Sequence, residues 1–302
     1  MKKISIIVPA YNEEESLPYF ISESNKVMDM IKEKFELIFI NDGSKDKTLE
    51  MLKDYSKKDK RIKYISFSRN FGKEAAMLAG LKMSNGDYVA IMDADLQDPP
   101  KYLIKMYELI TKEGYDCVGL RRVSRKGEPV IRSFFAKCYY KLINKISDVK
   151  VVDGARDFRL MTRQMVDSIL ELEENNRYSK GIFSWVGYNV KYLEYNNIER
   201  IAGNTKWSFF KLFKYSIDSI VGFSSFPLMI SIIFGLLSLF ISFVMFIILL
   251  FGKSTLFGII TLLLALNGFN YLFIGIIGIY ISKIQVETQN RPKYIIKETN
   301  IK

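Results

Sequence analysis

The chain has 302 residues, a formal charge of +11 and 49% apolar residues, which is enough for one sizeable domain or two smaller ones. It contains no histidine, so histidine catalysis and imidazole metal ligands are excluded, and carboxylates, Lys, Arg, Tyr or a bound metal must do any chemistry. The two cysteines, Cys117 and Cys138, lack C-x-x-C spacing, so no disulfide framework or zinc site is expected and a reducing compartment fits.

The first 120 residues alternate between apolar runs of strand length and helical stretches. The pattern predicts strands at residues 5–9, 35–40, 62–67, 88–92 and 115–120. It predicts helices at residues 14–34, 47–55 and 101–112, and one between the third and fourth strands that ends at residue 83. This alternation is typical of an α/β fold, Rossmann-like, with a mostly parallel sheet and helices on both faces.

Three of the predicted strands end in polar residues. Tyr11 and Glu13 follow the first strand, Asp42 follows the second, and Asp93 and Asp95 follow the fourth. Because the carboxyl ends of parallel strands line one edge of a sheet, where ligands bind, we expect these side chains to lie close together. Oxygen ligands such as these two aspartates select Mg²⁺ or Mn²⁺ over zinc. Taken alone, the segment also fits an acidic turn before a helix that begins with proline.

Acidic and aromatic groups at one edge suit a sugar nucleotide. Carboxylates accept hydrogen bonds from base N–H groups and ribose hydroxyls, an aromatic ring packs on a base or sugar, and a metal neutralises the diphosphate. Neither a Gly-x-Gly-x-x-Gly motif nor a Gly-x-x-x-x-Gly-Lys-Ser/Thr motif follows the first strand, so the sequence predicts neither a dinucleotide-binding fold nor a P-loop. We therefore expect the metal to carry the diphosphate charge.

The last third of the chain is apolar. Between Ser219 and Val286 there is no acidic residue, and the only basic residues are Lys253 and Lys283. Residues 227–250 and 259–281 each reach the roughly 20 apolar residues that cross a bilayer, which predicts two transmembrane helices joined by a short loop. A buried helix of a soluble protein is the alternative, but nothing else in the chain would cover so much apolar surface.

The basic residues lie mainly before the first apolar segment and after the second. The positive-inside rule therefore predicts a multi-pass protein of the cell membrane, with the N-terminal domain and both termini in the cytoplasm. The positive charge then indicates contact with anionic membrane lipids or a phosphorylated substrate. Nucleic acid is not expected as a partner, because no basic motif of a DNA- or RNA-binding protein is present.

Two basic amphipathic helices are predicted between the sheet and the apolar segments. They cover residues 130–146 and 207–217, and each combines apolar residues with several lysines. Such helices lie in a membrane interface, and the alternative is an ordinary surface helix packed on the sheet. Together they would frame a groove for a lipid whose phosphate meets arginines. A basic cluster precedes them, formed by Arg121, Arg122, Arg125 and Lys126.

Four motifs carry a resemblance to a known family. They are Pro9-Ala10-Tyr11-Asn12-Glu13-Glu14, Asn41-Asp42-Gly43-Ser44-Lys45-Asp46, Arg69-Asn70-Phe71-Gly72-Lys73 and Met92-Asp93-Ala94-Asp95-Leu96-Gln97-Asp98-Pro99. In this order and spacing they resemble family-2 glycosyltransferases of the GT-A fold, in particular the polyprenyl-phosphate glycosyltransferases, relatives of dolichol-phosphate mannose synthase. The end of the chain, residues 275–281 and 291–295, is similar to that of bacterial bactoprenol-linked members with two C-terminal helices.

The resemblance assigns roles to individual residues. The nucleotide-sugar pocket would be lined by Pro9, Tyr11, Glu13, Asp42, Lys73 and Asp93. The cation, Mg²⁺ or Mn²⁺, would be bound by Asp93, Asp95 and Gln97, and Asp95 also counts as catalytic. The acceptor phosphate would be bound by Arg121 or Arg122, Arg132 and Lys206. The chain departs from the family pattern at Asn41, where many members have a second acid.

Asp157 lies in a segment, residues 153–161, that resembles the second acidic motif of the family. This residue is the candidate for a catalytic base or a group that positions the acceptor, and a salt bridge to Arg156 or Arg159 is the alternative. A phosphate monoester is mostly dianionic at neutral pH and so already nucleophilic. Orientation and charge neutralisation should therefore matter more than proton removal.

The resemblance also implies an organisation and an activity. It predicts a GT-A glycosyltransferase domain over residues 1–200, an amphipathic juxtamembrane segment over 201–224, a two-helix transmembrane hairpin within 225–284 and a basic cytoplasmic tail over 285–302. The activity would be inverting, metal-dependent transfer of one sugar from UDP-glucose or UDP-N-acetylglucosamine to undecaprenyl phosphate or another polyprenyl phosphate. This reaction would take place at the cytoplasmic membrane face and supply lipid-linked sugar for cell-envelope glycan or lipid modification.

Other functions stay open at this point. GDP-mannose is an alternative donor. A processive polysaccharide synthase of the same superfamily would need a Gln-x-x-Arg-Trp motif and more membrane helices, which the sequence lacks. A catalytically silent membrane scaffold that recruits a partner such as a flippase is a third reading. A homo-oligomer is compatible with Asn267 and Asn270, which stand among glycines of the second apolar segment and suit helix packing.

Overall fold

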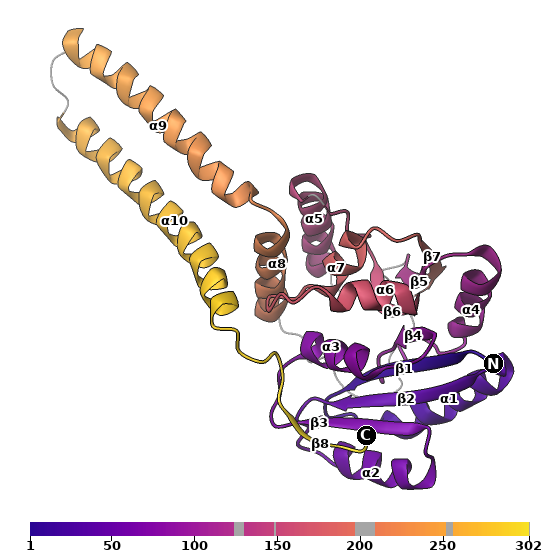
Figure 1. Cartoon of the computed structure of the whole chain (residues 1–302). Helices are drawn as coiled ribbons and strands as arrows, with labels where there is room; N and C mark the ends of the chain where they lie inside the picture. The colour runs from indigo at the N-terminus through magenta and orange to yellow at the C-terminus, as the bar shows by residue number, and fades with distance from the viewer. Residues whose placement is uncertain (124–129, 148, 197–208, 252–255, 302) are drawn as a thin grey trace.

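A computed structural model describes residues 1–123, 130–147, 149–196, 209–251 and 256–301. The described part contains a sheet with strand order β7-β5-β6-β4-β1-β2-β3-β8 (Figure 1). The strands are β1 (Lys3–Ala10), β2 (Lys34–Asn41), β3 (Ile62–Phe67), β4 (Tyr88–Ile91), β5 (Cys117–Arg122), β6 (Ala155–Thr162), β7 (Val190–Tyr195) and β8 (Ile296–Thr299).

The sheet is mostly parallel, as the sequence predicts. Strand β1 pairs in parallel with β2 and β4, β2 with β3, and β5 with β7. Strand β6 is antiparallel to β4 and β5, and β8 is antiparallel to β3. The five predicted strands are all present, although the fifth begins at Cys117, two residues later than predicted. Strands β6, β7 and β8 were not predicted.

Helices cover both faces of the sheet. They are α1 (Leu17–Ile31), α2 (Thr48–Lys58), α3 (Lys73–Met83), α4 (Tyr102–Glu113), α5 (Val130–Ile146), α6 (Arg163–Leu170), α7 (Ser179–Trp185), α8 (Phe209–Phe223), α9 (Phe226–Phe251) and α10 (Leu256–Thr288). One apolar core lies between the sheet and α1, α2 and α4, and a second lies between the sheet and α3, α6 and α7. Because successive strand residues face opposite sides, Ile6 enters the first core and Ile7 the second.

Helix α3 packs closely on the sheet because it is rich in small residues. A Cβ atom added at Gly80 would lie 2.2 Å from Cγ2 of Ile7, so a larger residue would push the helix away from β1. The close packing matters for function, because Lys73 is the first residue of this helix. The position of Lys73 over the sheet edge is therefore set by apolar packing one to two turns further along the helix.

Helices α9 and α10 lie side by side and extend away from the sheet (Figure 1). Among the described residues, one helical segment, Leu266–Thr288, is long and apolar enough to cross a membrane. Two shorter pieces, Ser216–Phe223 and Phe226–Ser238, pass the same test only together, and they meet at 83°. Helices therefore exist where the sequence predicts a hairpin, while their crossing of a membrane stays a prediction.

The C-terminal tail returns to the sheet after α10. Strand β8 pairs with β3, and the ring of Tyr294 stacks on Phe67 with 5.0 Å between centroids. Asn300 Oδ1 accepts a hydrogen bond from the backbone N–H of Tyr64 at 2.7 Å, and Asn300 Nδ2 donates to the carbonyl of Ile62 at 3.3 Å. The segment predicted as a separate basic tail thus supplies the edge strand beside β3.

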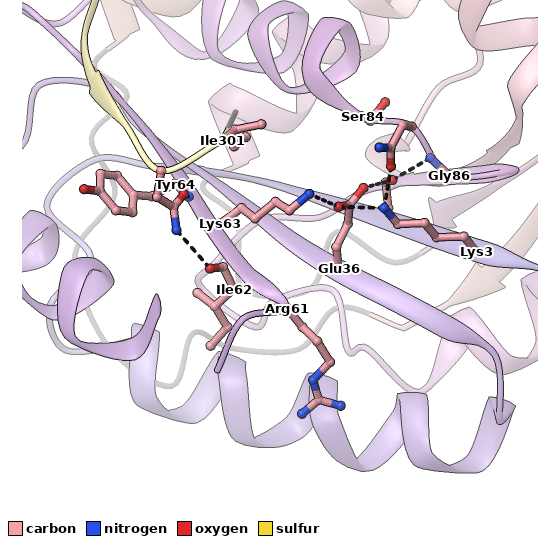
Figure 2. A network of polar contacts seen from close by, with 12 residues as sticks. Lys3, Glu36, Arg61, Ile62, Lys63, Tyr64, Ser84, Gly86 and Ile301 are labelled. Atoms are coloured by element: carbon pink, nitrogen blue, oxygen red, sulfur yellow. Dashed lines mark hydrogen bonds and ion pairs between the residues drawn. The ribbon is translucent and has the colours of Figure 1, made fainter. Parts of the chain in front are cut away.

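A buried carboxylate joins the first three strands near their amino ends. Glu36 of β2 has a 3% exposed side chain and accepts hydrogen bonds from Ser5 Oγ and Lys63 Nζ, both at 2.6 Å. Lys3 Nζ completes the cluster at 2.9 Å (Figure 2). Burial opposes the charge on Glu36, but the hydrogen bonds from Lys63, Ser5 and Lys3 outweigh burial, so the pKa of Glu36 is lowered.

We expect Glu36→Gln to lower the free energy of unfolding by about 1 to 3 kcal/mol at pH 7, because it removes charged hydrogen bonds to two lysines. Since the folded-state pKa of Glu36 is lowered, its contribution is complete above the ordinary glutamate value of about 4.3 and disappears as the pH falls through the folded-state pKa. The difference between the two proteins should therefore shrink in acid. Chemical denaturation of the full chain in detergent at several pH values measures it.

Glu23→Gln is the matched control. Glu23 pairs with Lys26 on the surface of α1, and its side chain is 48% exposed. Its loss should cost roughly 0.5 kcal/mol or less. Equal costs for the two substitutions would show that the Glu36 cluster adds nothing beyond a surface ion pair.

Candidate active site

The loops after β1 and β2 interlock at the carboxyl edge of the sheet. The N–H of Asn12 donates to Ser44 Oγ at 2.9 Å, and Asn12 Oδ1 accepts from the N–H of Lys45 at 2.8 Å. The N–H of Glu13 donates to Thr48 Oγ1 at 2.8 Å. The structure thereby brings Tyr11 and Glu13 next to the loop that carries Asp42, as the sequence predicts for strand ends that share an edge. Pro9 lies half-buried on β1, directly before this loop.

Asp42 is buried and organises the next loop. Its carboxylate accepts the backbone N–H of Phe71 at 2.6 Å and that of Gly72 at 2.9 Å, and the residue is 4% exposed. Burial raises the pKa of Asp42, and the two N–H donors offset part of this effect. Gly72 has a φ of +96°, which favours glycine. Asp42 therefore fixes the turn from which α3 begins, and a direct contact with a nucleotide stays a prediction.

Asn41, where many family members have a second acid, has a structural role. Its Nδ2 donates to Ser66 Oγ at 2.9 Å, and its Oδ1 accepts the backbone N–H of Ser44 at 3.2 Å. The side chain is 1% exposed. An amide fits both contacts because it is donor and acceptor at once, so Asn41 ties β2 to β3 and shapes the loop that carries Asp42.

Lys73 lies between two carboxylates from different strands. Its Nζ is 2.6 Å from Oδ1 of Asp93, which follows β4, and 2.5 Å from Oδ2 of Asp157 on β6. Burial opposes the charge on Lys73, but Asp157 and Asp93 outweigh it and raise the lysine pKa. Burial likewise opposes the charge on Asp157, yet Lys73 and Lys180 lower its pKa below the usual range. Lys73 and Asp157 are therefore both charged at neutral pH.

The carboxylate of Asp157 pairs with Lys73 rather than with either neighbouring arginine. Arg159 is 1% exposed, donates to the backbone carbonyls of Asp157 at 3.3 Å and Arg156 at 2.9 Å, and lies 3.7 Å from the ring centroid of Phe183. These contacts fix the backbone of β6 beneath the site. The side chain of Asp157 is 19% exposed, so its carboxylate is accessible to a ligand although Lys73 and the β6 backbone hold it in place.

The predicted metal ligands lie on the loop after β4. Asp93 and Asp95 flank Ala94, and Asp95 Oδ1 accepts the backbone N–H of Gln97 at 3.1 Å. The described residues contain no group of three His, Cys, Asp or Glu side chains that could hold a metal. Two carboxylates with one amide oxygen nevertheless fit Mg²⁺ or Mn²⁺, which take one or two protein carboxylates together with substrate phosphates. Asp93 would then have to share its carboxylate between the cation and Lys73.

The predicted acceptor arginines separate in space. Arg121 Nε donates to the carbonyl of Asp153 at 3.1 Å, and its Nη1 pairs with Glu194 at 3.3 Å. Arg122 is in register with Tyr195 of β7, and successive strand residues face opposite sides. These two arginines therefore cannot act as one cluster on one face. The side chain of Arg132, and Lys206 entirely, lie outside the described residues.

A further charged group at this edge was not predicted as part of the site. The carboxylate of Asp98 has no exposed surface, accepts Arg156 Nε at 3.0 Å through both oxygens, and accepts the hydroxyl of Tyr195. Asp98 belongs to the carboxylate-rich motif after β4, and its place in this motif could have marked it as a site residue from the sequence. Nothing in the sequence pairs it with Tyr195, which is 97 positions away.

Comparisons with known proteins agree with this geometry. The family model described as glycosyl transferase family 2 matches residues 5–170. A Bacillus subtilis protein named as a glycosyltransferase, CsbB, is 46% identical over 99% of this chain and 92% of its own length. The bactoprenol glucosyl transferase of Shigella phage SfII is 39% identical over 99% of this chain and 98% of its own length.

A solved structure shares the fold. Glucosyl-3-phosphoglycerate synthase from Mycobacterium tuberculosis, crystallised with Mn²⁺, UDP and phosphoglyceric acid, aligns with a TM-score of 0.50 at 18% identity. The alignment covers 73% of this chain and 76% of that one. At this identity the likeness concerns the fold alone.

We expect Lys73→Met to destabilise the protein in a pH-dependent way. Removing the cation leaves Asp93 and Asp157 facing each other, and like charges at this separation raise the pKa of one carboxylate. The loss should be about 1 to 3 kcal/mol at pH 7, less than for a fully buried pair because both carboxylates are partly exposed. It should diminish towards pH 5, where one carboxylate takes up a proton. Thermal unfolding at both pH values measures this difference.

Lys73→Arg is the control that keeps the charge, and its destabilisation should be smaller at pH 7. A loss for Lys73→Met that does not vary between pH 5 and pH 8 would contradict the bridging role of the lysine.

Proposed function

The chain belongs to glycosyl transferase family 2 and is a glycosyltransferase, and on this premise we propose that it transfers one sugar from a nucleotide-diphosphate sugar to a polyprenyl phosphate. Undecaprenyl phosphate is the acceptor we expect in a bacterial membrane. Relatives named bactoprenol glucosyl transferase align with this chain over 98% of their own length, which includes the C-terminal helices. The proposal therefore rests on the whole chain and not on the catalytic domain alone.

The observation that carries the proposal is the order of groups along the carboxyl edge of the sheet. The loops of β2 and β1 carry Asp42 and Tyr11, β4 leads into Asp93, β6 carries Asp157, and β5 ends in two arginines. A nucleotide over β1 and β2 would have its diphosphate over β4. The sugar would then lie near Asp157, and a second phosphate would approach from the β5 side.

Transfer in this arrangement is a direct displacement. The bond between the anomeric carbon and the donor diphosphate breaks, a bond to an oxygen of the acceptor phosphate forms on the opposite face, and the sugar is inverted. The acceptor oxygen is already anionic, because a phosphate monoester has its second pKa near 6. Lys73, Asp157 and Arg159 would act by holding charges in place rather than by moving a proton.

The proposal includes a divalent cation, Mg²⁺ or Mn²⁺, held by Asp93, Asp95 and the amide oxygen of Gln97. When bound, it would neutralise negative charge on the departing nucleoside diphosphate. Lys73 can keep its contact with Asp157 while Asp93 turns to the cation, because the lysine contacts both carboxylates.

Two membrane crossings by α9 and α10 complete the proposal. Strand β8, which follows α10, pairs with β3 of the catalytic sheet. This pairing supports an even number of crossings, because it brings the end of the chain back to the sheet. The lysines before α9 and after α10 favour the cytoplasm for that side.

We expect UDP-glucose or UDP-N-acetylglucosamine to label an organic-extractable lipid when the protein is incubated with undecaprenyl phosphate and Mn²⁺. The measurement is transfer of radiolabel from a panel of UDP- and GDP-sugars. EDTA should abolish the product, and Asp95→Asn should reduce the rate at least about 100-fold, as loss of a principal electrostatic group does. Asp167→Asn is the control, because Asp167 lies on α6 and pairs with Arg163 away from this edge.

Labelled lipid from GDP-mannose alone would overturn the expected UDP-sugar donor and still support polyprenyl phosphate as the acceptor. No labelled lipid from any donor, with protein that unfolds cooperatively, would overturn the transferase assignment to polyprenyl phosphate and favour a processive synthase or a silent scaffold.

The proposed topology makes a separate prediction. Alkaline phosphatase, which is active only outside the cytoplasm, should be active when fused after residue 251 and inactive when fused after residue 302. A fluorescent protein at the second position should be bright. An active phosphatase at the C-terminus would contradict the paired crossings.

A further inference from the structure

The guanidinium of Arg156 is held from one side. Its Nε donates to both oxygens of Asp98 at 3.0 Å, and the Asp98 carboxylate is fixed in turn by the hydroxyl of Tyr195. Within the described part of the chain, neither Nη atom of Arg156 has a hydrogen-bond partner, and the side chain is 26% exposed. The arginine is therefore oriented at its base and open at its tip.

Other arginines near this edge are used differently. The guanidinium of Arg159 is buried and donates its hydrogen bonds to backbone carbonyls. Arg121 pairs with Glu194 and donates to the carbonyl of Asp153. Arg156 alone of these three keeps both Nη atoms without a partner among the residues described. An anchored guanidinium with open Nη atoms matches the geometry of phosphate oxygens, which it can bind through two parallel hydrogen bonds.

The place of Arg156 indicates which phosphate it meets. Arg156 precedes Asp157 on β6, and β6 lies between β4, which leads to the predicted cation site, and β5. Asp98, Arg156 and Tyr195 lie over the sheet face opposite to α3, while Lys73 and Asp157 lie over the α3 face. In the strand order, Arg156 on β6 lies beyond β4 when viewed from the nucleotide loops, towards β5, which is the side of the acceptor in the proposed arrangement.

We propose that Arg156 binds the phosphate of the polyprenyl acceptor, and that Asp98 and Tyr195 are positioning residues which hold its guanidinium ready. This inference rests on the proposed function, because it assigns the acceptor phosphate of that reaction. Burial opposes the charge on Arg156, but the negative charges of Asp98 and Asp93 outweigh the effect of burial and raise the pKa of Arg156. The guanidinium is therefore charged before the ligand binds. The proposal adds Arg156 to the expected acceptor contacts, which are Arg121 or Arg122, Arg132 and Lys206.

A purely structural ion pair would look different. Asp98 is buried without exposed surface, so a partner is needed to offset its charge. A lysine or a tyrosine hydroxyl would satisfy a single carboxylate, but only an arginine offers Nε to the carboxylate and two more nitrogens to a second anion. The ion pair between Asp98 and Arg156 therefore orients the two Nη atoms of Arg156 for a second anion.

Binding of farnesyl phosphate, a short polyprenyl phosphate, tests the inference without catalysis. The full chain in detergent is titrated with farnesyl phosphate and with farnesol, which lacks the phosphate. We expect Arg156→Gln to weaken farnesyl phosphate binding about 10- to 100-fold, as the loss of hydrogen bonds to a charged group does. Farnesol binding should not change. Arg156→Lys should recover part of the affinity, and Tyr195→Phe should weaken it roughly 2- to 5-fold by releasing the orientation of Asp98.

Arg163→Gln is the matched control. Arg163 follows β6 at its other end, is 28% exposed, and donates to the carbonyl of Gly86 and to Ser84 Oγ. It should bind farnesyl phosphate as the parent protein does. Unfolding curves establish that each variant is folded, and Arg156→Lys replaces Arg156→Gln in the comparison if the glutamine variant is not.

The outcomes separate this inference from the proposed function. Equal affinity of the parent protein for farnesyl phosphate and farnesol would overturn the polyprenyl-phosphate acceptor itself. Preference for the phosphate in the parent protein, retained in folded Arg156 variants, would overturn the role of Arg156 alone. In the transfer assay, Arg156→Gln should raise KM for undecaprenyl phosphate and leave KM for the sugar nucleotide unchanged. A rise confined to the sugar nucleotide would assign Arg156 to the donor diphosphate and overturn the proposal.

Discussion

The lysine held between two carboxylates is the interaction on which the active site depends. Lys73 comes from α3, Asp93 from the loop after β4, and Asp157 from β6, so one ammonium group fixes the relative positions of three elements. Without a cation between them, two carboxylates in a partly buried site would repel each other. The bridge holds the two carboxylates close together around one ammonium group.

The position of Lys73 is itself set by residues that do not touch it. The buried carboxylate of Asp42 accepts the two N–H groups that precede α3, and the contact of Gly80 with β1 brings the helix close to the sheet. A carboxylate in a strand-end motif can thus serve function indirectly, by fixing the point from which the helix that carries Lys73 begins. This explains why Asp42 is buried although its motif suggests a ligand contact.

Much of the fold follows from local sequence, and the parts that do not are those made by distant pairing. The strands β1 to β5 are apolar runs that periodicity identifies. Periodicity does not identify β6, because Arg156, Asp157 and Arg159 interrupt its apolar pattern. It does not identify β8, because this strand has only four residues and two of them are charged. In the site, motif residues on neighbouring strands could be grouped in advance. The Asp98–Tyr195 contact could not, because it depends on strand register. The divergence of Arg121 and Arg122 could not either, because the predicted strand ended at residue 120 whereas β5 continues to Arg122.

The C-terminal end of α10 links the proposed membrane segment to the candidate active site. Lys283 pairs with Asp218 of α8 at 2.5 Å, and Glu287 accepts hydrogen bonds from the N–H groups of Asn175 and Asn176. Three residues after Asn176, the N–H and hydroxyl of Ser179 donate to Glu74, the neighbour of Lys73. In the proposed topology, this chain of contacts fixes Lys73 relative to the end of a membrane helix. A lipid phosphate is confined to the depth of the headgroup layer. A site that these contacts hold at a fixed height above the membrane would therefore meet its acceptor by lateral diffusion of the lipid alone.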